Sequence, residues 1–216
     1  CGAVMYFRHL RVCPSRLKPV LICLCAVFLG GTPISADFSG GDTQSEEFRE
    51  LIVRWFQYGV FSPVMRLHGN RNRHGEKSNL KEPSGDPNEL WSFGERIFEI
   101  LKNLVFLRER LRPYIEHHMK IASEKGYPVM RPMFFDFPDD KECYTLGEQY
   151  MFGDDILFAP IVNRGQTKKT VYLPEGEWIL TKDKKEYGKG YHTVTAEIDE
   201  FVAFVRKGAE IIECFA

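Results

Sequence analysis

Two side chains that could bind or activate a ligand, Arg66 and His68, stand one residue apart in the sequence. Val64, Met65 and Leu67 make the surrounding run apolar, and turn-forming residues bound it, which predicts a short buried strand followed by a polar loop. In an α/β protein, polar groups at the carboxyl ends of parallel strands face the active site. The pattern makes Arg66 and His68 candidate ligand contacts, although a histidine at a strand end can equally bond the backbone or cap a loop.

Other kinds of reactive site are not indicated. The sequence has no Gly-x-Ser-x-Gly nucleophile motif and no phosphate-binding glycine loop. Neither the cysteine spacings nor the histidines at positions 68, 74, 117 and 118 make a zinc pattern, and the adjacent His117 and His118 should point to different faces of a helix. We therefore expect no metal and no cofactor.

Composition limits the class of protein and of partner. The 216 residues are 44% hydrophobic and 13% aromatic, enough to bury a substantial core. The 29 basic and 30 acidic residues balance, so no bulk field attracts nucleic acid or an anionic membrane. Four of the six cysteines lie in the first 25 residues, which is not the distribution of a disulfide framework.

Residues 1–36 differ in composition from the rest. Basic residues precede an apolar run at residues 20–29, and Ile34, Ser35 and Ala36 then offer a small-residue cleavage point, which is the layout of a secretory signal peptide starting at Met5. The run is too short to cross a membrane as a helix. A buried strand, or a leader foreign to the ancestral protein in a fragment or misjoined gene, are the alternatives. Secretion is expected only under the first interpretation.

The next segments predict helices around the candidate strand. After a turn at residues 37–42, Thr43 and Glu46 form a capping box that should begin a helix, and Gly59 should end it. Beyond a polar loop at residues 70–88, a long helical pattern runs over 89–125, with a restart at Pro113 and a stop at Gly126.

A second buried strand is predicted at residues 128–136, ending in Asp136. Strand, helix and strand in this order favour a parallel crossover unit. Past Pro138 the apolar period becomes two, with short strands at 149–153, 156–161, 169–173, 192–195 and 201–206, as in an antiparallel β-sandwich. We predict three parts: a leader at 1–36, an α/β part at 37–145 and a β-sandwich domain at 146–216.

Together these motifs make the chain resemble the C-terminal portion of glycoside hydrolase family 31, the α-glucosidase and α-xylosidase family. The resemblance covers roughly residues 37–212 and is carried by order and spacing. Its motifs are FSGGD at 38–42, RWFQYG at 54–59, PVMRLHG at 63–69, WSFG at 91–94, LRPY at 111–114, MRPMF at 130–134, QYMFG at 149–153, LFAP at 157–160 and YLPEGEW at 172–178.

The resemblance implies the last strands of a (β/α)8 TIM barrel followed by an antiparallel β-sandwich domain, and a retaining mechanism with two aspartates. Both aspartates lie upstream of these motifs in the family, so we expect no catalytic residue in this chain. The part predicted as barrel holds about 110 of the roughly 250 residues that a complete barrel needs. The acidic clusters at residues 139–142 and 154–155 are turn neighbours whose carboxylates should diverge into solvent, so we expect neither to replace the missing pair.

Substrate-binding residues carry over position by position. His68 matches the family histidine that hydrogen-bonds sugar hydroxyls in subsite −1, and Arg66 beside it would orient the site. Asp37 matches the aspartate of the family pattern Asp-Ile-Gly-Gly-Phe, shortened here to Asp37-Phe38. The expected ligand is an α-linked glucoside or xyloside.

Three functional interpretations follow. The chain is part of an α-glycosidase and nearly inactive by itself, because the nucleophile and acid must come from a missing N-terminal half. Alternatively, it is a non-catalytic carbohydrate-binding remnant. The third is a truncated product whose open barrel exposes strand edges and apolar faces, which would make it unstable or homo-oligomeric.

Overall fold

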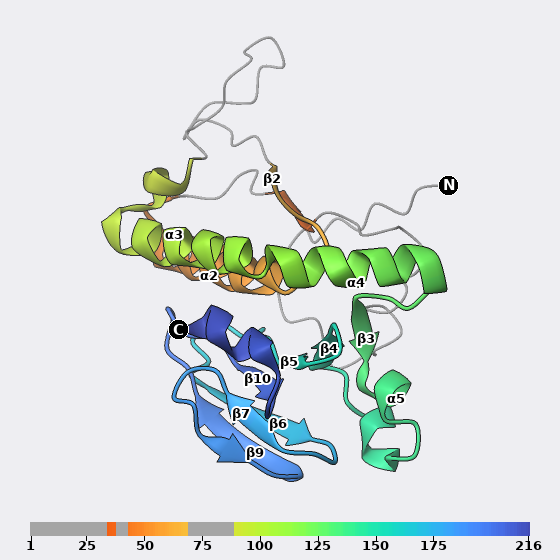
Figure 1. Cartoon of the computed structure of the whole chain (residues 1–216). Coiled ribbons are helices and arrows are strands. Elements are labelled where there is room, and N and C mark those ends of the chain that lie inside the picture. The colour runs from red at the N-terminus through yellow and green to blue at the C-terminus, as the bar shows by residue number, and fades with distance from the viewer. Residues whose placement is uncertain (1–33, 38–42, 69–88) are drawn as a thin grey trace.

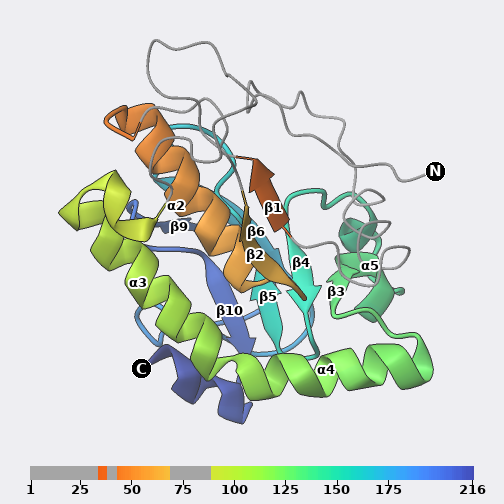
Figure 2. The same ribbon diagram turned by 90° about the horizontal axis from the view of Figure 1, so that it is seen from above.

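The computed structural model describes residues 34–37, 43–68 and 89–216, and it has three layers below a short parallel strand pair (Figure 1). The helix layer contains α2 (Glu46–Val60), α3 (Glu95–Arg110) and α4 (Arg112–Lys125). A six-stranded sheet lies under these helices, and a two-stranded sheet lies under its other face. Seen from above, α2 and α3 run side by side across the strands, and α4 continues along the edge (Figure 2).

Both sheets of the lower part are antiparallel. The larger one has the order β3-β4-β5-β10-β7-β8, and β6 pairs with β9 in the smaller one. The strands are β3 (Met130–Pro132), β4 (Tyr150–Phe152), β5 (Ile156–Phe158), β6 (Lys168–Leu173), β7 (Trp178–Leu180), β8 (Glu186–Tyr187), β9 (Gly190–Thr195) and β10 (Ala203–Arg206). Antiparallel strands were predicted over β4, β5, β6, β9 and β10, and all five are confirmed, whereas β7 and β8 were missed.

The central strands are apolar at every position because both of their faces are buried. In β4, Tyr150 and Phe152 face the helix layer, and Met151 faces the smaller sheet. In β5, Ile156 and Phe158 face the helix layer, and Leu157 faces the smaller sheet. Side chains of a strand alternate between faces, so a sheet covered on both sides requires continuous apolar runs.

Hydrogen bonds from α2 to main-chain carbonyls join the helix layer to the β-domain. The Nη1 atom of Arg54 donates to the carbonyl oxygens of Glu197 and Glu200 at 3.2 and 3.1 Å. The amide of Gln57 donates to those of Ile198 and Glu200 at 2.9 and 3.0 Å. The loop before β10 is thereby fixed through its backbone.

The start of α2 differs from the predicted capping box. Ser45 occupies the N-cap position, no side chain caps the helix, and the first helical residue is Glu46. Arg49 holds the segment before the helix instead, because its Nε donates to the Thr43 carbonyl at 2.7 Å and its Nη1 pairs with Glu46 at 3.1 Å. The helix ends at Val60, one residue beyond the predicted stop.

The long helical pattern is divided as predicted near Pro113. Proline has no N–H to donate, and α4 starts at Arg112 directly after Leu111, which closes α3. Gly126 ends α4 in the left-handed conformation, with φ of 74°. At the other end, residues Leu90–Phe93 form a 3₁₀ turn, η1, rather than the beginning of α3.

The predicted parallel crossover ending in a strand at residues 128–136 is wrong. Only Met130–Pro132 is extended, and it pairs antiparallel with β4. Residues Met133–Asp136 turn into the short helix α5. A short apolar run does not reveal the direction of its partner strand, which explains the error. The division predicted at residue 146 stays a prediction, and the antiparallel sheet already includes residues 130–132.

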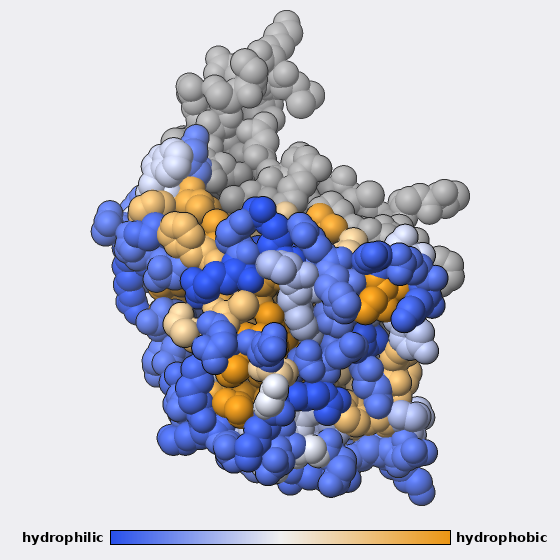
Figure 3. All heavy atoms as spheres, viewed as in Figure 1, coloured by the Kyte–Doolittle hydropathy of each residue, from blue (hydrophilic) through white to orange (hydrophobic). Residues whose placement is uncertain are grey.

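Apolar side chains appear on the surface over the helix layer, and further apolar patches lie among the hydrophilic residues below it (Figure 3). Trp91, Val105 and Phe106, from η1 and α3, are exposed by 68, 42 and 55%. In the described part of the chain, no helix has the length and apolar character needed to cross a membrane.

Trp178 should be the largest single contributor to the lower core. Its ring is fully buried, its Nε1 donates to the Pro174 carbonyl at 3.1 Å, and the Arg206 guanidinium lies 4.8 Å from the ring centre. We expect Trp178→Ala to lower the free energy of unfolding by about 3–5 kcal/mol in urea titrations. The control Trp91→Ala removes an exposed ring and should cost less than about 0.5 kcal/mol. Equal losses would contradict this description of the core.

Gly153, in the turn between β4 and β5, should tolerate no side chain. Its φ is +65°, and an added Cβ would lie 2.6 Å from Cε1 of the Tyr114 ring. Gly165 has a similar φ of +68° with open space around it. We expect Gly153→Ala to cost about 3 kcal/mol from backbone strain and overlap, and Gly165→Ala about 1 kcal/mol from strain alone. Chemical denaturation of both variants measures the difference, and a cost at Gly153 no larger than at Gly165 would disprove the overlap.

Candidate substrate-binding site

The parallel pair β1 (Ile34–Asp37) and β2 (Met65–His68) brings the three predicted substrate-binding residues together in the backbone. Asp37 is the register partner of His68, and both are the last residues of their strands. Arg66 is the register partner of Ser35. Because a strand alternates with period two, positions 35, 37, 66 and 68 belong to one face of the pair.

This arrangement is the one expected at the carboxyl end of a parallel sheet. Adjacent strands are about 4.8 Å apart, so Asp37 and His68 start from neighbouring backbone positions at the same edge. A carboxylate accepts hydrogen bonds and an imidazole can donate one, and both suit sugar hydroxyl groups. Contact of these residues with a sugar stays a prediction.

The acidic cluster around Asp140 is occupied by structural contacts. The Asp140 carboxylate accepts a hydrogen bond from the Tyr172 hydroxyl at 2.8 Å and pairs with Lys189 at 3.2 Å. The Tyr172 hydrogen bond is the main cause that lowers the pKa of Asp140. A partly buried carboxylate with these partners ties turns together, and nothing in its contacts suggests a proton donor.

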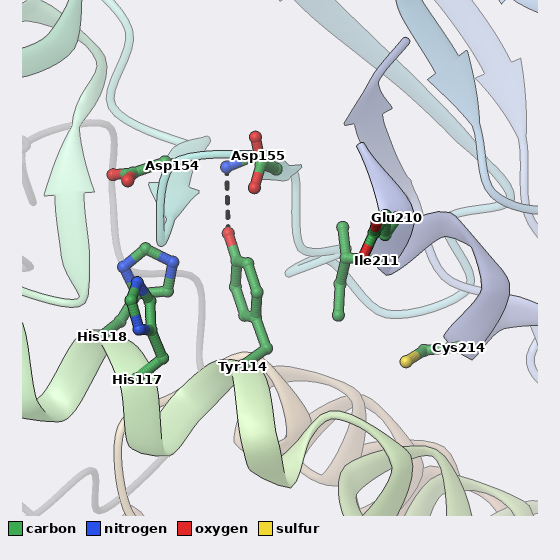
Figure 4. Close-up of a pocket in the computed structure, with 8 residues that line it drawn as sticks. All are labelled: Tyr114, His117, His118, Asp154, Asp155, Glu210, Ile211 and Cys214. Atoms are coloured by element: carbon green, nitrogen blue, oxygen red, sulfur yellow. Dashed lines mark hydrogen bonds between the residues drawn. The ribbon is translucent and has the colours of Figure 1, made fainter. Parts of the chain in front are cut away.

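A cleft of about 460 Å³ lies between α4, the turn after β4, and the C-terminal 3₁₀ helix Glu210–Phe215 (Figure 4). Two histidines of α4 and the acidic turn residues were considered separately in the sequence, but their proximity was not predicted. The lining residues are Tyr114, His117, His118, Asp154, Asp155, Glu210, Ile211 and Cys214. Over the described residues, no three His, Cys, Asp or Glu side chains gather in a way that could hold a metal ion.

Tyr114 connects the helix layer to the β-domain inside this cleft. Its hydroxyl accepts a hydrogen bond from the Asp155 N–H at 2.9 Å (Figure 4). The same hydroxyl donates to the Phe152 carbonyl at 3.1 Å. Burial raises the pKa of this hydroxyl, which therefore stays protonated. The cleft is thus a polar seam between the two parts of the chain, and its contacts are structural.

Arg131 forms the buried centre of the same region. Its side chain is 3% exposed and pairs with Asp136 and Asp154, each at 2.8 Å. Burial is the largest effect on Asp136 and raises the pKa of that carboxyl despite the ion pair. The acids that follow β3 and β4 therefore neutralise one buried guanidinium, which is a structural role.

Comparison with known proteins decides the family. Residues 21–117 match the family model described as "Glycosyl hydrolases family 31 TIM-barrel domain", and residues 126–212 match "Glycosyl hydrolase family 31 C-terminal domain". The chain belongs to glycoside hydrolase family 31. The predicted fold class is confirmed: a segment of the family 31 barrel is followed by an antiparallel β-sheet domain.

Two of the curated relatives have names that describe an α-glucosidase and an α-xylosidase. Alpha-glucosidase 2 of Bacillus thermoamyloliquefaciens is 34% identical over 75% of this chain and 19% of its own length. Alpha-xylosidase of Saccharolobus solfataricus is 34% identical over 82% of this chain and 23% of its own length. The family 31 chain thus spans about a fifth of these relatives.

A solved structure of a family 31 α-xylosidase from a soil metagenome, complexed with xylose, is 42% identical and superposes with a TM-score of 0.76. The likeness covers 82% of this chain and 27% of that one. The barrel match begins at residue 21, so it includes β1 and most of the apolar run interpreted above as part of a leader.

Two family motifs have a structural explanation in the contacts described. In LRPY, Pro113 lies in the first turn of α4 and Tyr114 bonds the β-domain, which places the motif at the seam. In MRPMF, Arg131 is the buried centre of the two ion pairs. The motifs could have indicated the seam from sequence, but only the fold shows which partners they meet.

We expect His118 to lower the stability of the folded chain in mild acid. Its side chain is 3% exposed, and burial lowers its pKa from 6.5, against the opposing effect of Asp154. A histidine with a lowered folded-state pKa binds protons more readily when unfolded, so its contribution to stability is present above pH 6.5 and is lost as pH falls. We expect His118→Gln to reduce the loss of unfolding free energy between pH 7.5 and 5.5. The control is Ser123→Ala, an exposed change on the same helix that removes no titratable group and should keep the wild-type pH dependence. An unchanged pH dependence in His118→Gln would refute this.

Proposed function

We propose that this chain supplies the sugar-binding end of the barrel of a retaining α-glycosidase that acts on α-linked glucosides or xylosides. The observation that carries the proposal is the register of Asp37 with His68 at the carboxyl ends of two parallel strands. The barrel-domain match and the named activities of the relatives support it.

In the proposed mechanism, the two catalytic aspartates come from sequence outside this chain. One carboxylate attacks the anomeric carbon, and the glycosidic oxygen leaves with the proton of the other carboxyl group. Water, deprotonated by that second carboxylate, then releases the sugar from the covalent intermediate. Asp37, Arg66 and His68 contribute by binding hydroxyl groups of the sugar, so their interactions must strengthen as the ring approaches the transition state.

The exposed features of the helix layer support a missing barrel portion. In the described part of the chain, β1 and β2 pair only with each other, which leaves strand edges that a closed barrel would satisfy. Trp91, Val105 and Phe106 are exposed on the same layer. Further barrel sequence would cover such surfaces, and without it we expect self-association.

The chain alone should bind sugar weakly and hydrolyse nothing. Without the two carboxyl groups, only ground-state contacts remain. We expect NMR titration with xylose or glucose to perturb the region of β2, and p-nitrophenyl α-xyloside and α-glucoside to release no product. His68→Ala should abolish binding. His192→Ala is the control, because His192 lies on β9 and bonds the Gly188 carbonyl at 2.8 Å. Turnover by the isolated chain would contradict the proposed division of roles.

A chimera tests the catalytic part of the proposal. The aligned segment of the soil-metagenome α-xylosidase is replaced by this chain, so that both aspartates are present. We expect activity on p-nitrophenyl α-xyloside, with kcat/KM about 100-fold lower for His68→Ala, since hydrogen bonds that strengthen in the transition state supply several kcal/mol. An inactive chimera, together with sugar binding by the chain, would favour a carbohydrate-binding remnant instead.

A further inference from the structure

The turn between α2 and β2 is held by side chains of other elements at four consecutive carbonyls. Arg108 of α3 supplies three of these bonds: its Nη1 donates to the Val60 and Ser62 carbonyls at 2.7 and 2.5 Å, and its Nη2 donates to the Pro63 carbonyl at 2.8 Å. The last carbonyls of a helix have no partner within the helix. Arg108 therefore satisfies the end of α2 and the approach to β2 together.

The fourth carbonyl belongs to Phe61 and is bonded from the β-domain. The hydroxyl of Tyr150, on β4, donates to it at 2.8 Å. The Phe61 ring is fully buried, stacks on Phe158 with centroids 4.2 Å apart, and meets Phe152 edge-on at 6.0 Å. The turn that leads to β2 is thus inserted into the core beneath the helices.

Charge strengthens the clamp on this turn. Burial lowers the pKa of Arg108 to about 10, so the guanidinium stays charged near neutral pH. A positive group is favoured at the negative end of the α2 dipole, and charge-assisted bonds are stronger than neutral ones. The planar fork of arginine reaches several carbonyls at once, which a lysine ammonium on one flexible stem does not reproduce.

The clamped turn is close to the candidate sugar-binding residues along the chain. Pro63 is two residues before Met65, the first residue of β2, and His68 ends that four-residue strand. Met65 also packs on α2 where Gly59 has no side chain, since a Cβ there would lie 3.1 Å from Met65 Cγ. A strand this short has no independent stability, so its position follows the turn before it and the pairing with β1.

We propose that Arg108 and Tyr150 are positioning residues that set the place of β2, and that the β-domain thereby determines sugar affinity at His68. The inference rests on the proposed function for its effect on sugar binding. Its structural half, the ordering of β2 by these two side chains, depends only on the contacts given above.

Two tyrosines provide a matched comparison in the full chain. Tyr150→Phe and Tyr114→Phe each remove one hydroxyl that donates to a backbone carbonyl across the seam between helices and sheet. Only the first of these bonds holds the turn before β2. We expect Tyr150→Phe to speed backbone hydrogen exchange at residues 65–68 and weaken xylose binding about 5-fold, while Tyr114→Phe changes neither. Urea unfolding of both variants shows whether their overall stabilities are similar.

A second pair tests the guanidinium. Arg108→Lys keeps the charge and loses the fork, and Arg110→Lys is its control on the same helix, because Arg110 bonds a single carbonyl, that of Cys214, at 2.7 Å. We expect faster exchange at residues 65–68 and weaker xylose binding only for Arg108→Lys.

The outcomes separate the two proposals. Equal exchange at residues 65–68 within each pair would overturn the positioning role. Faster exchange with unchanged xylose affinity would overturn its link to sugar binding. If the unaltered chain binds no xylose or glucose, the proposed function fails, and the exchange comparison still decides whether Arg108 and Tyr150 order β2.

Discussion

The six-stranded sheet must bury both of its faces, and the rest of the fold depends on how this is achieved. Its upper face consists of large apolar side chains that would be exposed without the helices. The smaller sheet covers the lower face in the same way. Burial of apolar surface contributes roughly 25 cal/mol per Å² to the free energy of folding. Covering two such faces is therefore the largest favourable contribution available to a chain of this size. The helix layer and the β-domain therefore share the core above the sheet, and a second core lies between the two sheets.

This shared core ties barrel and β-domain together more closely than a linker would. The aromatic cluster around Phe61 includes side chains from β4 and β5 and from the C-terminal end of the chain, because Phe215 lies over the same ring with centroids 6.3 Å apart. Residues separated by about 150 positions thus meet at one ring. In a family 31 enzyme built this way, the β-domain is a structural part of the barrel end.

Much of this arrangement follows from local patterns that the sequence displays. Amphipathic spacing predicts α2 and the α3 region, Pro113 and Gly126 give the helix break and stop, and short apolar segments between turns give five of the antiparallel strands. These features depend on neighbours in the chain, which is why they can be predicted. The strand β8 has two residues and is too short for a pattern. The strand β7 is as long as β4 and β5, which were predicted, so its length does not explain why it was missed.

The errors share a different cause. The direction of β3 depends on β4, a strand about twenty residues away, and the same apolar run would suit a parallel or an antiparallel partner. The N-cap of α2 was misplaced because the helix begins after Ser45, where no side chain caps it, and Arg49 binds the Thr43 carbonyl and the Glu46 carboxylate instead. At the candidate site, residue types and a family resemblance indicated Asp37, Arg66 and His68. Only the strand pairing shows Asp37 beside His68 in the backbone.

The bonds of Arg54 and Gln57 to the loop before β10 end on main-chain oxygens. Every amino acid carries such an oxygen, so these bonds specify the path of the loop and do not depend on which side chains it carries. Substitutions can therefore accumulate at the exposed Glu197 as long as the backbone keeps its course, whereas Ile198 also packs on the core and the Glu200 carboxylate also bonds Lys182 and the Glu197 N–H. Evolutionary change in this seam should be uneven: slow on the helix that donates, and fast on the loop only where the side chain has no second contact.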